Sequence, residues 1–188
     1  MKLRNIIVLV VVFIALGGVA FYFANRTEPV AETEEPQVFV WRIDMDEIQH
    51  IAVQLPREGK GESFVKISGG DNSAWYFDNA QHSTVDTARW GAGIPLLLSG
   101  PQAGRIVAEN ASSETLAEYG LDQPLMEITL TLNDKSTLDI RVGDRTPSGG
   151  FYYVQAPGSN AVALVDYTWY DALARLVTEP PYASTTAG

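Results

Sequence analysis

The sequence has no cysteine and only two histidines, His50 and His82. Without thiols the chain can form no disulfide, no cysteine zinc site and no cysteine nucleophile. Basic residues are also scarce, because 13 lysines and arginines face 23 aspartates and glutamates in 188 residues, for a net charge of -10. A nucleic-acid-binding protein would need a basic surface to neutralise phosphates. The composition therefore excludes thiol chemistry, leaves little imidazole for catalysis and argues against nucleic acid as a partner.

One long hydrophobic run, residues 6–24, contains no charged side chain. At about 1.5 Å rise per residue, a helix over this run would be about 28 Å long, which is close to the hydrocarbon thickness of a bilayer. We therefore predict that residues 1–26 form a short cytoplasmic stub and a transmembrane anchor. Cleavage of this segment as a signal peptide after Ala20 is the alternative, although secretory signals usually have shorter apolar regions.

Basic residues set the expected orientation of the anchor. Lys2 and Arg4 precede the hydrophobic run, whereas Arg26 on its far side is followed by four glutamates before residue 36. The positive-inside rule then places the N-terminus in the cytoplasm. Removing these three basic residues leaves 10 of the 13 against 23 acidic residues, or -13 on the exported part. We expect the chain in a bacterial cytoplasmic membrane, with its C-terminal domain in the periplasm or outside the cell.

Small residues lie along one side of the predicted span. Gly17, Ala20 and Ala24 fall at positions i, i+3 and i+7, so they would share a face on which a second helix could approach closely. The alternative is that glycine and alanine are common in membrane helices generally. Both interpretations stay open at this point.

After the anchor, the composition divides the chain into three parts. Residues 27–37 contain two prolines, four glutamates and no aromatic residue, a composition typical of an extended linker. Residues 38–180 carry the alternating apolar pattern of a folded domain, and residues 181–188 are expected to form a flexible tail.

The folded domain is predicted to be α+β, with a mainly antiparallel sheet and a few helices. The second half repeats the first in outline, so we hypothesise two similar βββα halves. Expected strands cover residues 50–55, 64–67, 75–77, 105–109, 127–132, 137–142, 151–155 and 161–165. Expected helices cover residues 85–98, 113–119 and a segment after residue 166 with Trp169, Leu173, Leu176 and Val177 on one side.

Capping residues define the expected helix ends. Ser83 or Thr84 would cap the first helix, which Pro95 would bend. Ser113 would cap the second helix, and Asp166 or Thr168 the third. At the end of the second helix, Gly120 supplies a left-handed exit that would let Leu121 pack back on Leu116 in a Schellman motif.

No residue pattern points to catalysis, a cofactor or a metal. The cluster Asp44, Asp46 and Glu47 lacks the glycine and distal glutamate of an EF-hand loop, so a solvated turn is the better interpretation. Residues 143–150 form a glycine-rich loop in which Arg145, beside backbone donors, is a candidate for holding an anion. The loop lacks phosphate-loop spacing and lies between two predicted strands, which favours a hairpin connection. We expect a protein that is not an enzyme.

Consecutive aromatic residues are the more informative feature. Alternation along a strand sends neighbouring side chains to opposite sheet faces, so some of these rings would fill the core while others would be exposed or covered by a partner. The candidate interaction aromatics are Trp75, Phe77, Tyr152 and Trp169. Core filling on both faces is the competing interpretation.

The turn Tyr119-Gly120-Leu121-Asp122-Gln123-Pro124 resembles that of a bacterial family catalogued only as domain of unknown function 4340. The resemblance extends over most of residues 45–178, including the strand Ile128–Leu132, the Asn133-Asp134-Lys135 turn, Ile140–Gly143 and Gly150–Val154, and upstream Trp75–Phe77 and Thr84–Asp86. Similar proteins typically have an N-terminal membrane anchor, and some resemble companions of ABC-type transport or gliding-motility membrane components. The resemblance implies no activity and no catalytic residue.

Together these features predict a single-pass membrane-anchored, non-enzymatic accessory or scaffold subunit. It would dock an extracytoplasmic domain onto a larger membrane complex, with a connection to transport suggested by the resemblance. The alternative is an anchored binding module for a small solute or an envelope glycan, for which a concave aromatic-lined pocket should exist. No cofactor is expected in either case.

Overall fold

The computed structural model describes residues 16–17, 38–69, 72–90 and 93–183. Apart from Leu16 and Gly17, which are helical and exposed, the predicted span 6–24 lies outside the described residues. So do Ala20, Ala24 and the predicted linker 27–37. Within the described residues, no helix is both long and apolar enough to cross a membrane. The chain divides into two units, Met1–Pro36 and Gln37–Gly188, and the following concerns the second.

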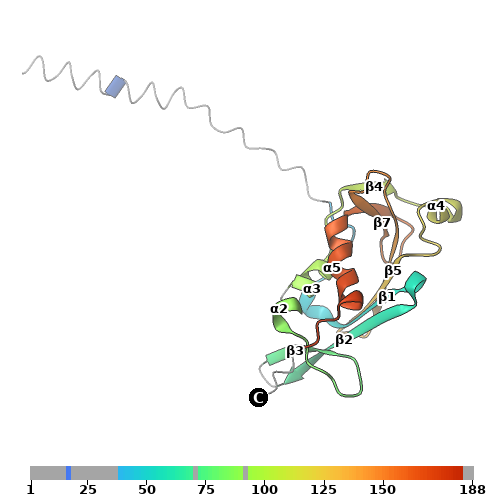
Figure 1. Cartoon of the computed structure of the whole chain (residues 1–188). Coiled ribbons are helices and arrows are strands. Elements are labelled where there is room, and N and C mark those ends of the chain that lie inside the picture. The colour runs from blue at the N-terminus through green and yellow to red at the C-terminus, as the bar shows by residue number, and fades with distance from the viewer. Residues whose placement is uncertain (1–15, 18–37, 70–71, 91–92, 184–188) are drawn as a thin grey trace, which may run out of the picture. The chain divides into compact units, whose positions relative to one another are not determined.

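One eight-stranded sheet forms the body of this unit, in the order β3-β2-β1-β5-β6-β7-β8-β4 (Figure 1). Every neighbouring pair is antiparallel, which confirms the predicted fold class. The strands are β1 (Ile48–Leu55), β2 (Lys60–Gly69), β3 (Asn72–Phe77), β4 (Arg105–Ala108), β5 (Met126–Leu132), β6 (Thr137–Arg145), β7 (Phe151–Gln155) and β8 (Val162–Asp166).

Helices lie mainly against one face of this sheet. The elements are η1 (Met45–Glu47), η2 (Pro56–Glu58), α2 (Thr87–Trp90), α3 (Gly93–Ser99), α4 (Ser113–Glu118) and α5 (Tyr167–Thr178). In Figure 1, α2, α3 and α5 lie together on one side of the sheet, whereas α4 lies apart from them. The asymmetry explains why the strands alternate between apolar and polar residues, since only one face is broadly covered.

The main core lies between the sheet and these three helices. Along β1, Ile51, Val53 and Leu55 are buried, while the residues between them point to the other face. Strands β2, β5 and β6 of the same sheet contribute Phe64, Ile128, Leu130 and Ile140. From α5, the predicted set Trp169, Leu173, Leu176 and Val177 is buried, so the helical stripe read from the sequence is confirmed.

A second, smaller apolar cluster is separate from this core. Ala111, Leu121 and Val162 are buried in it, with Leu116, Tyr119 and Tyr153 packed against them. It joins α4 and the turn that follows α4 to β7 and β8. Because β7 sends Tyr152 and Val154 into the main core, Tyr153 must point to the opposite face. The small cluster therefore covers one end of the otherwise open sheet face.

Three predicted helix boundaries need correction. The predicted helix 85–98 is two helices, α2 and α3, and Pro95 lies in the first turn of α3, where its missing N–H costs nothing. Asp86 caps α2, because its Oδ1 accepts from the backbone of Ala88 and Arg89, so neither Ser83 nor Thr84 does. The cap of α4 is Ser112 rather than Ser113.

The predicted flexible tail is wrong for its first residues. The Tyr182 ring stacks on Phe77 at 4.0 Å between centroids, and Tyr182 forms a β-bridge with Val85. Ala183 N donates to Thr84 O at 3.3 Å. Residues 181–183 therefore belong to the domain, and residues 184–188 lie outside the described part.

The strand order is compatible with the hypothesised repeat. β1-β2-β3 and β5-β6-β7 are both three-stranded meanders, and β1 pairs with β5 between them. Ala52 lies opposite Thr129 at the centre of this pairing. The elements that follow differ, however, because α2, α3, β4 and α4 follow the first meander and β8 and α5 follow the second. The duplication stays a hypothesis that a superposition of the two halves would test.

Leu173 on α5 should be essential for stability because its side chain is fully buried. We expect Leu173→Ala to lower the free energy of unfolding by about 2–5 kcal/mol through lost apolar contact and a residual cavity. Leu96→Ala on α3 is the matched control, since Leu96 is 59% exposed, and it should cost no more than about 0.5 kcal/mol. Urea titration of the full chain in mild detergent, followed by tryptophan fluorescence, measures both. Equal losses for the two variants would contradict this packing.

Candidate functional site

The candidate site is built around the turn that follows α4. Gly120 adopts φ +70°, its N–H donates to Ala117 O at 3.0 Å, and Leu121 N–H donates to Leu116 O at 2.8 Å. These two hydrogen bonds are those of a Schellman motif, and Leu121 is 1% exposed. The predicted left-handed exit and its apolar contact are therefore confirmed.

Two glycines let this turn lie directly against β6. A Cβ on Gly143 would lie 2.1 Å from Tyr119 O, and a Cβ on Gly120 would lie 2.5 Å from the Asp144 carboxyl carbon. The Tyr119 carbonyl belongs to the backbone, so a side chain at position 143 would force the backbone to shift. At position 120 a side chain would have to displace the Asp144 carboxylate and adopt a positive φ that favours glycine. Asp144 N donates to Tyr119 O at 2.8 Å across the same contact. We call this close backbone contact among Tyr119, Gly120, Gly143 and Asp144 the clasp.

Arg57 of η2 ties a third segment to the clasp. Its Nε and Nη2 donate to Gln123 O at 2.8 Å and 2.6 Å, and Nη2 lies 2.9 Å from Asp144 Oδ1. Asp122 and Pro124 flank the carbonyl that accepts from this arginine. The pair with Asp144 is partly exposed, so it contributes little energy by itself. Arg57 nevertheless links the turn, through Gln123 O, to Asp144 on β6.

A groove of about 600 Å³ lies beside the clasp. β4 lines it with Arg105, Ile106 and Val107, while the turn between β6 and β7 contributes Thr146, Pro147 and Ser148. Leu164 of β8, Tyr153 of β7 and Tyr119 of the clasp complete the lining. The groove is open to solvent, and its walls come from five separate stretches of sequence. No local pattern could have predicted it.

Tyr119 and Tyr153 form the aromatic part of the groove. Their rings stack at 4.2 Å between centroids with 9° between planes, and both are half-buried. Tyr119 belongs to the predicted signature turn, whereas Tyr153 lies in the aromatic run but was not among the candidate residues. The missed signal was strand alternation, which sends Tyr153 to the face opposite Tyr152.

A bulge in the edge strand brings three consecutive side chains to the groove. The pairing of β4 with β8 shifts register between Ile106 and Ala108. In a regular strand, neighbouring side chains would point to opposite faces, but a bulge re-aims them locally. Arg105, Ile106 and Val107 can therefore all line one groove, and Ile106 is 43% exposed.

The predicted interaction aromatics are core residues. Phe77, Tyr152 and Trp169 are buried, so the prediction that they form an exposed surface is wrong for these three. Trp75 is partly buried and lies 5.4 Å from Trp90 between ring centroids. Phe77 and Tyr152 belong to strands and point to the sheet face that the helices cover, and Trp169 belongs to α5, one of the covering helices.

Trp169 and Trp41 both hold the end of α3. Trp169 Nε1 donates to Leu97 O at 2.9 Å, and Trp41 Nε1 donates to Leu98 O at 3.0 Å. The last carbonyls of a helix lack partners within the helix, so these indoles satisfy groups that would otherwise be buried without one. Their role is structural.

Arg145 lies on tyrosine rings rather than facing an anion. Its guanidinium carbon is 5.2 Å from the Tyr167 ring centroid and 5.9 Å from that of Tyr152. Tyr152 in turn stacks on Tyr170 at 4.1 Å. Residues 146–150 connect β6 to β7 as a hairpin, with Thr146 N donating to Phe151 O at 2.8 Å, which confirms the predicted connection.

Burial raises the pKa of both stacked tyrosines. For Tyr152 desolvation is the main cause, and Arg145 opposes it. For Tyr170 desolvation again dominates, and the neighbouring Tyr152 and Glu58 raise its pKa further. Desolvation disfavours the phenolate because the charged form loses hydration.

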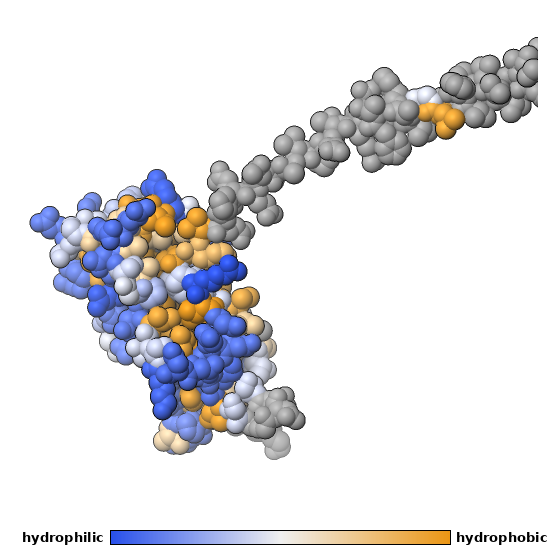
Figure 2. All heavy atoms as spheres, turned by 180° about the vertical axis from the view of Figure 1, so that it is seen from behind, coloured by the Kyte–Doolittle hydropathy of each residue, from blue (hydrophilic) through white to orange (hydrophobic). Residues whose placement is uncertain are grey.

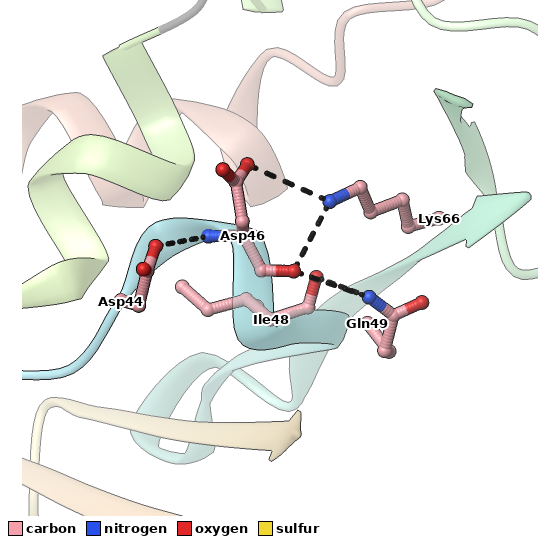
Figure 3. Close-up of polar contacts among 5 residues, drawn as sticks. All are labelled: Asp44, Asp46, Ile48, Gln49 and Lys66. Carbon is pink, nitrogen blue, oxygen red and sulfur yellow. Dashed lines mark hydrogen bonds and ion pairs between the residues drawn. The ribbon is translucent and has the colours of Figure 1, made fainter. Parts of the chain in front are cut away.

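The acidic cluster before β1 is a capped turn (Figure 3). Asp44 Oδ1 accepts from Asp46 N at 2.9 Å, and Lys66 Nζ donates to Asp46 O at 3.3 Å while its distance to Asp46 Oδ1 is 4.0 Å. Gln49 Nε2 donates to Ile48 O at 3.3 Å. A capped, mostly exposed turn agrees with the interpretation preferred from the sequence. In the described residues, no three His, Asp or Glu side chains gather closely enough to hold a metal ion.

The two histidines lie apart. His50 Nε2 is 3.1 Å from Asp78 Oδ2, which joins β1 to the end of β3 through a partly exposed pair. His82 adopts φ 44° in the polar turn after β3. The prediction of surface roles therefore fits the positions of both.

The clasp predicts different outcomes for two glycines of the same hairpin. Gly143→Ala should lower the free energy of unfolding by about 1–3 kcal/mol, because the added methyl group must displace the Tyr119 carbonyl. Gly150→Ala is the control, since its Cβ would meet nothing within 4 Å, and it should change stability by no more than about 0.5 kcal/mol. Urea titration measures both variants. If Gly143→Ala were as stable as Gly150→Ala, the close contact would not exist.

The raised pKa values of Tyr152 and Tyr170 predict a loss of stability in alkali. Their pKa values are higher in the folded chain than the ordinary 10.0, so the unfolded chain releases these protons first as pH rises. The stability that these two protonated tyrosines add to the folded chain is fully present below pH 10, and it is lost as the pH rises through their pKa values in the folded chain. Tyr170→Phe should therefore lose less stability between pH 9 and pH 11 than the wild type, roughly the range around the ordinary tyrosine pKa. Urea midpoints across this range test this, and identical slopes would contradict it.

Comparison with known proteins gives one match. Residues 97–179 match the family model described as Domain of unknown function (DUF4340). The matched segment runs from α3 to the end of α5 and includes the signature turn Tyr119–Pro124 and every residue that lines the groove. The part of the sequence resemblance that precedes residue 97 lies outside it. No curated protein matches the chain, and neither does any solved structure. The resemblance noted in the sequence is confirmed for residues 97–179, which match this family of unknown function.

Proposed function

We propose that this protein is a single-pass, membrane-anchored accessory subunit without enzymatic activity, and that it docks its extracytoplasmic domain on a larger bacterial membrane complex. The groove beside the clasp is the docking surface. The observation that carries this proposal is an open groove lined by Ile106, Val107, Leu164 and two stacked tyrosines at the edge of the sheet.

The exposed apolar side chains support a protein partner. Ile106 is 43% exposed, and the tyrosine pair presents flat, amphipathic rings of the kind enriched at interfaces. Hydrophobic and hydrophilic residues are interspersed over the face shown in Figure 2, so apolar surface is confined to patches. A patch that combines apolar side chains with a preformed groove is a typical interaction site.

The point at which the chain enters the domain also supports docking close to the membrane. Val38 O accepts from Ala103 N at 2.7 Å, two residues before β4 begins. The thirteen residues 25–37 can span at most about 43–47 Å. With an anchor at residues 6–24, the point beside β4 at which the chain enters the domain would be held within about this distance of the bilayer, where a membrane complex is accessible.

The stacked tyrosines also favour a second candidate, an anchored binding module for a small solute or an envelope glycan, because sugar rings stack on aromatic faces. Sites for small ligands usually enclose most of the ligand surface. This groove is open to solvent and bounded by the edge strand β4, which suits a polypeptide better than a small solute.

Site-specific crosslinking in native membranes tests the docking proposal. A photoreactive residue replaces Ile106 in one full-length variant and Ile67 in another. Ile67 on β2 is the matched control, because it is 38% exposed and lies at the other end of the sheet. We expect one discrete crosslinked product from position 106 and none from position 67.

A second substitution makes the test specific for the groove. Adding Tyr153→Ala to the Ile106 variant removes half of the aromatic pair and should abolish the crosslink while leaving the amount of membrane-bound protein unchanged. Equal crosslinking from both positions, or a crosslink that survives Tyr153→Ala, would show that the groove is not the docking surface. Retention of an oligosaccharide by the purified protein, without any crosslink, would favour the binding module.

A further inference from the structure

We infer that the occupant of the groove is an extended segment of the partner protein, which adds to β4 as a ninth strand and places a carboxylate against Arg105. This inference rests on the proposed docking function and specifies how the partner is recognised. Three observations support it: the outer backbone of the edge strand β4, the side chains that the bulge in β4 brings to the groove, and the positive charge of Arg105 in the groove.

Within the part of the chain that the structure describes, nothing pairs with the outer side of the β4 backbone. β4 is the last strand of the sheet and pairs with β8. Ala103 N donates outward to Val38 O, whereas Gly104 N donates inward to Leu164 O. Since the backbone groups of an extended strand alternate in direction, those of Arg105 point outward again. Among the described residues, none from Arg105 to Ala108 has a backbone partner outside β8.

Residues 38–40 already pair with the sheet edge immediately before β4. Phe39 forms an antiparallel bridge with Gln102, and Val40 N donates to Pro101 O at 3.1 Å. This segment continues the sheet edge beside residues 101–103, immediately before β4. An added strand beside Arg105 would therefore extend an arrangement that the domain itself uses, as in recognition by strand addition.

The side chains beside this edge provide specificity for alternate residues of an added strand. Ile106 and Val107 line the groove together with Leu164. A strand paired with β4 would direct every second side chain towards the groove, where an apolar residue would contact these three and the tyrosine pair. The intervening side chains would point away from it.

Arg105 gives the groove a positive charge in an acidic domain. Most of the ten basic residues after residue 26 are engaged: Arg57, Lys60, Lys66 and Arg141 in ion pairs, Arg89 with backbone carbonyls, and Arg42 and Arg145 on aromatic rings. Among the described residues, Arg105 has no such partner and is exposed at the groove. Guanidinium groups pair with carboxylates in two-point geometry, so an aspartate or glutamate of the partner fits here. A second copy fits less well, because antiparallel pairing of β4 with itself would bring two Arg105 side chains together.

Selection from a phage-displayed library of random decapeptides tests the inference, with the full-length protein and its Arg105→Glu variant as parallel targets. Peptides that bind the wild type should carry an acidic residue at one position, with apolar residues at alternate positions beside it. They should lose at least about tenfold in affinity for Arg105→Glu, since a charge-assisted hydrogen bond becomes a repulsion. Peptides in which that acidic residue is replaced by lysine should bind the Arg105→Glu variant with the affinity that the original peptides lost.

Arg175→Glu is the matched control, because Arg175 is also exposed and has no ion pair among the described residues but lies on α5. The affinity of the selected peptides for this variant should equal that for the wild type. No enriched peptide, or equal losses for Arg105→Glu and Arg175→Glu, would overturn the inference.

Amide hydrogen exchange of the same complexes distinguishes strand addition from contact through side chains alone. Bound peptide should slow exchange of the Arg105 amide at least about tenfold and leave Asn72, on the opposite edge strand β3, unchanged. Unchanged exchange at Arg105 would overturn strand addition. Protection of Arg105 before any peptide is added would show that residues of the chain itself occupy the edge, which also overturns it. In either case a crosslink from position 106 would leave the docking proposal intact.

Discussion

Pairing of β1 with β5 is the constraint on which the rest of the domain depends. It joins the β1-β2-β3 meander to β5, β6, β7, β8 and β4 in one continuous sheet. Ile51 lies opposite Leu130 and Val53 opposite Ile128, and all four side chains are buried. These cross-strand apolar pairs fix the register, because a slip of one residue would turn each strand's apolar side chains to the open face. With the register fixed, the polar face, β7 and the edge strand β4 all have defined positions.

Much of this architecture could be predicted from the sequence because it depends on local periodicity. The buried side of α5 and the exit at Gly120 follow from spacing and from backbone preference. The exact caps could not be predicted, since Ser112 and Asp86 compete with neighbouring residues that are equally able to cap. Burial of Phe77 and Trp169 depends on which sheet face the helices cover, and that is decided by long-range packing.

The groove could not be predicted for the same reason. Its lining comes from β4, the clasp, the β6–β7 turn, β7 and β8, and only the tertiary fold brings these together. What the sequence did contain was the signature turn, whose glycine has a plain physical role. Gly120 supplies the positive φ of the turn, and Gly143 allows the Tyr119 carbonyl to approach β6 more closely than any side chain would permit. This arrangement places Tyr119 on Tyr153. The most specific part of the family pattern thus shapes one wall of the proposed docking surface.

Hydroxyl-radical footprinting of the full-length protein, in native membranes and after purification, tests the central claim most directly. The account predicts that Tyr119 and Tyr153 react less in membranes than in the purified protein, because a partner covers the groove there. Ile67 and Tyr182, which are 38% and 48% exposed elsewhere on the domain, should react equally in both. Equal reactivity of the two groove tyrosines in membranes and in isolation, or protection only at Ile67 and Tyr182, would contradict the account.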